Sequence, residues 1–259
     1  MSLLRRVVST IGNSDWNRRF LSNKRTSPPN GERSYFFKIA RYLWRRFPQP
    51  LRYRFWLWWG EVLPYQRIIY RGKVLRWGRD RTKAYRAVFP TAPAGESILD
   101  LGCHTGFYCF MAASEGAKHC LGIDHVASRI KEGMELVARE GIRNVELVAA
   151  DVFDYDLPRT FDLVLCLNLL HHMRSIERAE ALIEKVYGWS RERIVFIVLR
   201  PRNASATYEY VDEYGTRYLH FSAQYFRDKY GTDRIDESRL DPGCYGANRS
   251  MIVLEKCKR

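Results

Sequence analysis

The sequence predicts an α/β fold, in which helices cover both faces of a mostly parallel sheet. Between residues 97 and 199, short apolar segments typical of strands alternate with segments of helical periodicity. Near-continuous apolar runs at 161–167 and 194–199 are typical of strands that are buried on both faces. Repeated strand–helix alternation produces such a sheet through right-handed crossovers.

The individual elements follow from the same patterns. Strands are expected at 97–101, 118–123, 144–149, 161–167 and 192–199, with helices at 106–115, 126–140 and 174–188. The polar, Tyr-rich residues 200–220 predict a loop or insertion near the strand ends. After a helix at 221–230, the segments 233–240 and 250–255 fit a closing antiparallel pair of strands.

The first ninety residues differ in composition from the rest. They hold 21 of the 43 Lys and Arg residues, 4 of the 29 acids and six of the seven Trp residues. We expect a flexible basic tail at 1–33, a basic aromatic helical extension at 34–90 that ends in a helical connector from 65, and the main domain at 91–259. The extension favours contact with an acidic membrane surface or with RNA. The alternative is a lid that packs on the protein's own surface.

Cysteine usage and apolar run length bear on location. Six cysteines show no CxxC pair and no zinc-type spacing, which predicts reduced thiols, no metal site and a cytoplasmic location, at a membrane surface if the extension binds lipid. No apolar run reaches about 18 residues, so no transmembrane helix is expected. The first 28 residues weakly resemble a mitochondrial transit peptide, which is the alternative location.

A glycine turn follows the first predicted strand of the main domain. It reads Asp100-Leu-Gly102-Cys103-His104-Thr-Gly106. Gly102 lets the backbone approach a ligand, and Gly106 lets the next helix begin close to it. The helix N-terminus offers unpaired N–H groups to an anion such as a carboxylate. An ordinary strand–helix turn is the alternative explanation.

Polar residues end the next three strands as well. Asp124 lies 24 residues after Asp100, where an acid can accept hydrogen bonds from both hydroxyls of a ribose. Asp151 and Val152 end the third strand and suit an adenine amino group and ring. Asn168 ends the fourth. Together these strand ends predict a nucleoside-binding crevice.

These motifs, over about residues 95–199, resemble the class I S-adenosylmethionine-dependent methyltransferases; residues 200–259 match more loosely and residues 1–90 do not match. The resemblance implies a three-layer, Rossmann-like, seven-stranded, mostly parallel sheet with an antiparallel last strand, and S-adenosyl-L-methionine as cofactor. In that family the turn holds the methionine part, and the fourth strand end faces the sulfonium. The cofactor-binding residues implied are Asp100, Gly102, Cys103, His104, Gly106, Asp124, His125, Asp151, Val152 and Asn168. The family often has glycine where this chain has His104.

Methyl transfer requires alignment of the acceptor and exclusion of water, and a general base only if the acceptor must lose a proton. His171 and His172 are the candidate bases, because imidazole titrates near neutral pH; a packing role is the alternative. The Tyr-rich segment supplies the candidate acceptor-binding residues Tyr208, Tyr210, Tyr218 and His220.

The tetrad 168–171, Asn-Leu-Leu-His, stands where family members that methylate base amines often carry Asn/Asp-Pro-Pro-Tyr. We therefore expect O-methylation of a small-molecule, glycan or lipid-linked acceptor near a membrane. One alternative is an RNA or tRNA methyltransferase that uses the basic arm, and another is a catalytically silent cofactor-binding or scaffold subunit. The lack of a Gly-x-Gly-x-x-Gly spacing argues against a nicotinamide dehydrogenase.

Overall fold

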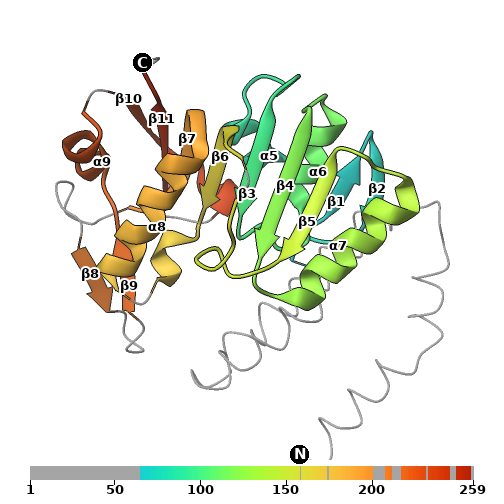
Figure 1. Cartoon of the computed structure of the whole chain (residues 1–259), viewed down its shortest axis with the longest axis horizontal. Coiled ribbons are helices and arrows are strands. Elements are labelled where there is room, and N and C mark those ends of the chain that lie inside the picture. Colours follow the sequence, from blue (N-terminus) through green and yellow to red (C-terminus); the bar gives the residue numbers. More distant parts are fainter. Residues whose placement is uncertain are drawn as a thin grey trace, which may run out of the picture. The chain divides into compact units, whose positions relative to one another are not determined.

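A computed structural model describes residues 65–157, 159–173, 175–200, 208–211, 217–231, 233–245 and 249–257 (Figure 1). These residues belong to one compact unit, residues 61–259. The predicted tail at 1–33 and the first part of the predicted extension, 34–64, lie outside the described residues.

A seven-stranded sheet forms the centre of this unit (Figure 1). Its strands lie in the order β10-β11-β7-β6-β3-β4-β5. Only β11 runs antiparallel to its neighbours β7 and β10, which confirms the predicted mostly parallel sheet with an antiparallel last strand. The strands are β3 (Ser97–Leu101), β4 (His119–Asp124), β5 (Val145–Ala149), β6 (Phe161–Leu167), β7 (Ser190–Leu199), β10 (Arg234–Arg239) and β11 (Arg249–Glu255).

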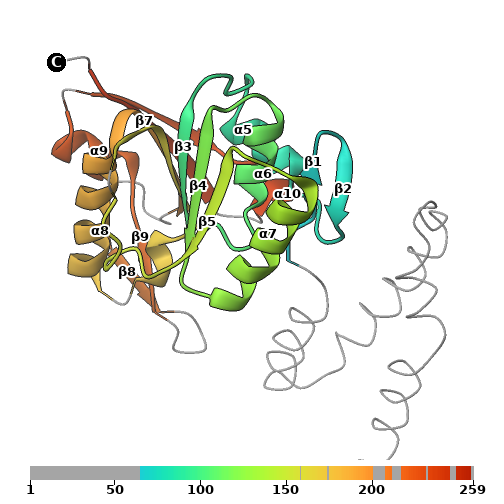
Figure 2. The same ribbon diagram turned by 45° about the vertical axis from the view of Figure 1, so that its right-hand side comes forward.

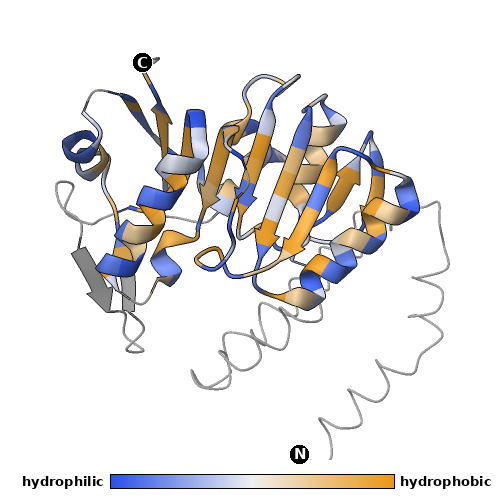
Figure 3. Ribbon diagram, viewed as in Figure 1, coloured by the Kyte–Doolittle hydropathy of each residue, from blue (hydrophilic) through white to orange (hydrophobic). Residues whose placement is uncertain are grey.

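Helices pack on both faces of the sheet (Figure 2). One face carries α5 (Thr82–Val88), α6 (Phe107–Ser114) and α7 (Ala127–Glu140), and the other carries α8 (Ile176–Trp189) and α9 (Ala223–Lys229). Successive strand residues supply the two apolar cores: Ile98 packs with the first group of helices and Leu99 with the second. Apolar residues run along the central strands, whereas polar residues mark the outer sides of α7 and α8 (Figure 3).

The segment before the main sheet corrects the first part of the predicted helical connector, whereas α5 confirms a helix at its end. Residues 68–76 form a hairpin of β1 (Ile68–Tyr70) and β2 (Lys73–Arg76). Arg71 and Gly72 at its tip have φ values of 47° and 74°, as a tight two-residue hairpin turn requires. Ile68 is fully buried in the same core as α6, so this segment packs with the domain that was predicted to start at residue 91.

Basic residues of this segment pair with acids of the same compact unit. The five ion pairs are Arg67–Asp80, Lys73–Glu140, Arg76–Glu132, Lys83–Asp241 and Arg86–Glu115. Each pair has at least one exposed partner, and such surface pairs contribute at most about 1 kcal/mol each, so their main effect is to neutralise charge. These five basic residues of the segment are therefore paired within the protein itself.

Two further differences concern the end of the chain. Strands β8 (Tyr208–Val211) and β9 (Arg217–His220) pair antiparallel as a hairpin, where the sequence predicted a loop or insertion. A short helix α10 (Pro242–Tyr245) precedes β11. No helix within the described ranges is both long and apolar enough to cross a membrane.

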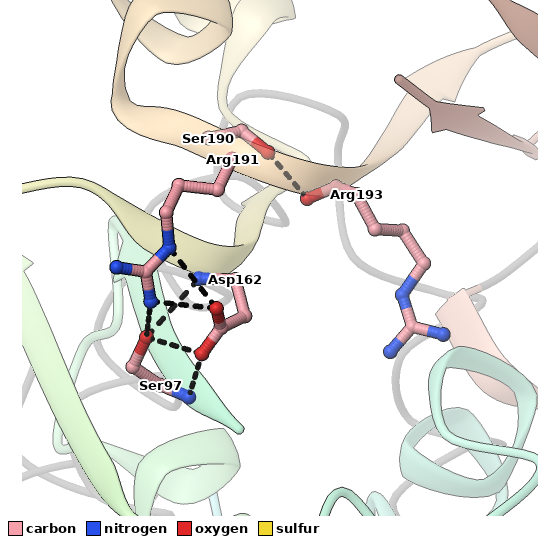
Figure 4. A network of polar contacts seen from close by, with 5 residues as sticks. All are labelled: Ser97, Asp162, Ser190, Arg191 and Arg193. Atoms are coloured by element: carbon pink, nitrogen blue, oxygen red, sulfur yellow. Dashed lines mark hydrogen bonds and ion pairs between the residues drawn. The ribbon is translucent and has the colours of Figure 1, made fainter. Parts of the chain in front are cut away.

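Polar contacts join the amino ends of β3, β6 and β7 (Figure 4). Oδ2 of Asp162 accepts hydrogen bonds from the Ser97 N–H at 2.8 Å and from the Ser97 hydroxyl at 2.7 Å. Its Oδ1 accepts from Nη2 of Arg191 at 2.6 Å. Burial opposes ionisation of Asp162, but these donors outweigh it and lower the pKa of Asp162. The network holds three neighbouring strands in register.

Candidate functional site

The polar residues predicted at the strand ends meet at the carboxyl edge of the sheet, where the arrowheads of β4 and β5 point (Figure 1). The two halves of this edge differ in charge. The half formed by β3, β4 and β5 carries the acids Asp100, Asp124 and Asp151. The half formed by β6, β7 and β11 carries Asn168, His171, His172, Arg200 and Arg249.

The glycine turn is tied to the end of β4. The N–H groups of Gly102 and Cys103 donate to the carbonyl oxygen of Ile123 at 2.8 and 3.1 Å. The N–H of His104 donates to Oδ2 of Asp124 at 2.9 Å, so one carboxylate fixes the turn. Residues 102–104 therefore lie directly beside the acid predicted to bind ribose.

Left-handed backbone conformations shape this turn. Gly102, His104 and Gly106 have φ values of 71°, 57° and 91°. A Cβ on Gly106 would lie 3.0 Å from a methyl group of Leu147, so that position requires glycine on two grounds. The positive φ at His104 explains why glycine is common there in the family that the sequence resembles. The His104 ring bonds Thr105 Oγ1 through Nδ1 at 2.8 Å.

Asp100 is buried beneath the turn, with 2% of its surface exposed. Its Oδ2 has no hydrogen-bond partner among the described residues. Burial, and secondly the charge of Asp124, raise the pKa of Asp100 well above its usual range. A buried carboxyl oxygen without a partner is costly, and an ammonium group of a ligand would satisfy it. Asp100 therefore fits the amino group of a bound amino acid.

Asp124 retains hydrogen-bonding capacity although it is 5% exposed. Its Oδ2 accepts from the His104 N–H, and its Oδ1 accepts from the Val126 N–H at 2.9 Å. Each carboxylate oxygen has a second lone pair, so two further donors such as ribose hydroxyls fit the residue. The neighbouring His125 is exposed, with its Nδ1 3.8 Å from Oδ1 of Asp124.

Asp151 and Val152 follow β5 at the outer end of the acidic half. Oδ1 of the exposed Asp151 accepts from the Phe153 N–H at 2.9 Å. Arg178 lies 3.6 Å from Oδ2 of Asp151, and its guanidinium carbon lies 4.1 Å from the centre of the Phe153 ring. Val152 and Phe153 are half-buried, so apolar surface accompanies the acid, as an adenine ring requires.

Cys103 contributes to the site through its backbone. Its side chain is buried, and a Cβ on Gly122 would lie 2.8 Å from its sulfur. Burial raises the pKa of the Cys103 thiol well above its usual range. The Cys103 thiol is therefore part of the hydrophobic core, whereas the Cys103 backbone N–H is part of the glycine turn.

Asn168 and the two histidines form the other half of the site. Asn168 follows β6 with a φ of 56°, and its Oδ1 accepts from Nε of Arg249 at 2.8 Å. The His171 and His172 rings lie 4.1 Å apart in the short helix η1 (Leu170–His172). Burial, with His172 and Arg249, lowers the pKa of His171 to about 3. Desolvation and Arg249 also lower the pKa of the more exposed His172.

The predicted acceptor-binding residues lie on the β8–β9 hairpin. Tyr208 is paired with His220, and Tyr210 with Tyr218, across the hairpin. Strand β9 packs on η1, and the buried His220 is close enough to His171 to lower its pKa. The hairpin thus brings His220 to the candidate bases, while the three Tyr side chains lie outside the described side chains.

A group of residues beside the glycine turn was not predicted from the sequence. The Arg81 guanidinium carbon lies 5.0 Å from the ring centres of both Tyr65 and Tyr245. The Tyr65 ring is 5.0 Å from that of His104, and the Tyr245 hydroxyl bonds that of Tyr108 in α6. Arg81 is therefore a fixed cation near the N-terminus of α6, although no local pattern marks it.

A hollow of about 730 Å³ lies at the opposite, amino edge of the sheet. Asp162, Arg191 and Lys256 line it. Asp162 and Arg191 pair with one another, and Lys256 donates to backbone carbonyls at the end of α8. The hollow contains satisfied structural contacts, so the carboxyl edge is the better candidate site. Within the described residues, no three His, Cys, Asp or Glu side chains are grouped to hold a metal ion.

Comparison with known proteins agrees with this geometry. Residues 98–192 match the family model described as "Methyltransferase domain". Residues 98–192 are thus similar to a methyltransferase domain. The resemblance to class I S-adenosylmethionine-dependent methyltransferases is thus confirmed over these residues, and the Rossmann-like fold that it implies is confirmed as well.

Individual relatives are distant. A (S)-coclaurine N-methyltransferase from Thalictrum flavum is 28% identical over 46% of this chain and 33% of its own. A ubiquinone biosynthesis O-methyltransferase from Chromobacterium violaceum is 31% identical over 44% of this chain and 48% of its own. This chain therefore spans less than half the length of these curated relatives. A 1,6-didemethyltoxoflavin-N1-methyltransferase structure from Burkholderia thailandensis shares the fold, with a TM-score of 0.54, 18% identity and coverage of 69% and 77% of the two chains.

Proposed function

We propose that this chain is an S-adenosylmethionine-dependent methyltransferase that methylates an oxygen of a small-molecule, glycan or lipid-linked acceptor. The observation that carries the proposal is Asp100, a buried carboxyl whose Oδ2 has no hydrogen-bond partner among the described residues. It lies at the end of β3, beside the start of α6. An amino acid supplies an ammonium for this oxygen and a carboxylate for the helix N-terminus.

The remaining acidic residues extend this site toward a nucleoside. Asp124 has lone pairs for ribose hydroxyls, and Val152 with Phe153 offers apolar surface to a base. When bound, the cofactor supplies an activated methyl group on a sulfonium. The protein's own part is to orient the acceptor in line with that methyl group and to exclude water.

Two features favour oxygen as the acceptor atom. The tetrad 168–171 lacks the Pro-Pro-Tyr that accompanies amine methylation of bases in the family. His171, with a pKa of about 3, is a weak base at neutral pH, which suits an acceptor oxygen that carries no proton to be removed. The relatives include both N- and O-methyltransferases, so they do not decide between the two atoms.

We further propose that residues 34–64 hold the chain at an acidic membrane surface. This stretch contains six Lys and Arg residues, one acid and four Trp residues. Trp at headgroup level and Arg beside acidic lipid suit that composition. A lipid-linked acceptor would then be presented to the site at the membrane.

The acceptor atom is tested with S-adenosylmethionine labelled with carbon-13 in its methyl group. The purified protein is incubated with an extract of its source organism, and the labelled products are examined by carbon NMR. We expect an O–CH3 chemical shift together with formation of S-adenosylhomocysteine. An N–CH3 or S–CH3 shift would overturn the O-methylation proposal, and no binding of S-adenosylhomocysteine would overturn the methyltransferase proposal itself.

A further inference from the structure

Arg81, directly before helix α5, lies against two tyrosine rings. Its guanidinium carbon is 5.0 Å from the ring centres of both Tyr65 and Tyr245, and these contacts hold the cation in place. Its Nη1 donates a hydrogen bond to the carbonyl oxygen of Cys244 at 2.7 Å. Among the residues that the structure describes, no acid pairs with Arg81. The positive charge of Arg81 is therefore fixed in position but not neutralised by a carboxylate.

One edge of this guanidinium suits a carboxylate. Nε of Arg81 is buried and has no hydrogen-bond partner among the described residues. Nε lies on the same side of the planar group as Nη2, whereas the contact with Cys244 uses Nη1. A buried N–H group without a partner is costly, and a carboxylate satisfies the Nε–Nη2 edge with two parallel hydrogen bonds.

Asp100 lies within electrostatic reach of the same group. Tyr108, the second residue of α6, shares a hydrogen bond between hydroxyls with Tyr245. Burial raises the pKa of both hydroxyls; to a smaller extent, the charge of Asp100 raises it and the charge of Arg81 lowers it. The unpartnered oxygen of Asp100 and the unpartnered Nε of Arg81 thus flank one tyrosine pair at the first turn of α6.

We infer that Arg81 binds the carboxylate of the cofactor's methionine part, while Asp100 binds its ammonium. An α-amino acid carries both charges on one carbon, so it requires an acid and a cation on two sides of one small space. The positive end of α6, which begins at Phe107, supports the same carboxylate. The assignment rests on the proposed methyltransferase function. It adds a cofactor-binding residue outside residues 98–192, the range that matches the family model.

Tyr65 is the exposed neighbour of the guanidinium. This residue has 42% of its surface exposed, and its ring lies 5.0 Å from that of His104, so it bridges Arg81 and the glycine turn. Tyr108, by contrast, is only 4% exposed. A ligand in the turn therefore reaches the buried Nε by displacing Tyr65, without disturbing the packed tyrosine pair.

Calorimetric binding of three matched nucleosides to the full chain tests this assignment. The probes are S-adenosylhomocysteine, its primary carboxamide and its decarboxylated analogue; all keep the ammonium and the nucleoside, and only the first has a carboxylate. We expect S-adenosylhomocysteine to bind about tenfold or more tightly than either analogue, because its contact with Arg81 is charge-assisted. Equal binding of the three overturns the assignment alone, whereas binding of none overturns the methyltransferase proposal with it.

Variants at Arg81 separate direct contact from a role in folding. Arg81→Gln should reduce the preference for the carboxylate to below about threefold and leave affinity for the decarboxylated analogue within about threefold of the unsubstituted value. Arg81→Lys should retain part of the preference, because lysine keeps the charge but lacks the two-donor edge. Arg79→Gln removes the same charge from an exposed position and should change nothing. Equal weakening of all three probes in Arg81→Gln, or loss of the preference in Arg79→Gln, overturns the assignment.

The Nε–H group of Arg81 gives a readout that does not depend on affinity. In protein labelled with nitrogen-15 in its arginine side chains, the Nε–H resonance that is missing from Arg81→Lys belongs to Arg81. Saturation with S-adenosylhomocysteine should shift this resonance and slow its exchange with water, because the N–H gains a carboxylate partner. Saturation with the decarboxylated analogue should do neither. The same response to both nucleosides overturns the assignment.

Discussion

The backbone N–H of His104 donates a hydrogen bond to Oδ2 of Asp124 over 2.9 Å. This bond joins the glycine turn after β3 to the acid that ends β4. The glycine turn, predicted to hold the methionine part of the cofactor, and Asp124, predicted to bind the ribose, are thus joined in one structural unit. The shape of the turn depends on its left-handed residues, of which Gly106 has the largest φ, 91°.

Gly106→Ala should lower the free energy of unfolding by about 2 kcal/mol. The added methyl group would be 3.0 Å from Leu147, in a backbone conformation that alanine rarely adopts. Urea unfolding measures the change. Gly188→Ala is the control, because nothing lies within 4 Å of that position in α8, and alanine there should stabilise by up to about 1 kcal/mol. Stabilisation by Gly106→Ala would contradict the described turn.

Asp162→Asn should lower the free energy of unfolding by about 1–3 kcal/mol, because it weakens a charged hydrogen-bond network at the amino edge (Figure 4). S-adenosylhomocysteine affinity, measured by calorimetry, should stay within about twofold of the unsubstituted protein, since this edge lies opposite the candidate site. A selective loss of cofactor affinity without a loss of stability would instead place function in the amino-edge hollow.

Stability should decrease as pH falls below about 6.5. His171 has a pKa of about 3 in the folded chain, so between these values only the unfolded chain binds the proton. At pH 5 this difference costs roughly 2 kcal/mol. His171→Asn should reduce the slope of unfolding free energy against pH between 6.5 and 5. His125→Asn, at an exposed ring, should keep the original slope. Identical slopes in all three proteins would show that His171 does not titrate as described.

Substitution of Arg41, Arg45 and Arg46 by Gln in the full chain should weaken its flotation with vesicles that contain acidic lipid. Each basic residue near such a surface contributes about 1 kcal/mol, so the loss should be large at low salt and should become smaller as added salt screens the charges. Replacing Arg227, Arg234 and Arg239 removes equal charge elsewhere and should have little effect. Salt-sensitive binding to RNA, without flotation, would favour the RNA alternative instead.

The sequence predicted the main sheet because its strands are buried on both faces and therefore consist of long apolar runs, as in β6 and β7. It missed β1 and β2, because strands of three and four residues carry almost no periodicity. The sequence signal that was available for this hairpin is the pair Arg71-Gly72, since both residues of such a hairpin turn have positive φ.

The acidic half of the site was predictable for a different reason. Asp100, Asp124 and Asp151 end successive parallel strands, so their order along the chain already places them on one edge. Arg249 lies at this edge because β11 runs antiparallel to β7. Arg81 lies there because of how the residues before the sheet pack. The position of such residues at the site becomes evident only from the complete strand order and strand directions.

Calorimetric titration with S-adenosylhomocysteine tests the central claim most directly. The unsubstituted protein should bind one molecule, and Asp124→Ala should weaken binding about tenfold or more, because it removes the ribose contacts and the anchor of His104. Asp154→Ala, at an exposed acid in the loop after β5, should bind as the unsubstituted protein does. Absence of binding by the unsubstituted protein, or unchanged affinity in Asp124→Ala, would contradict the assigned site.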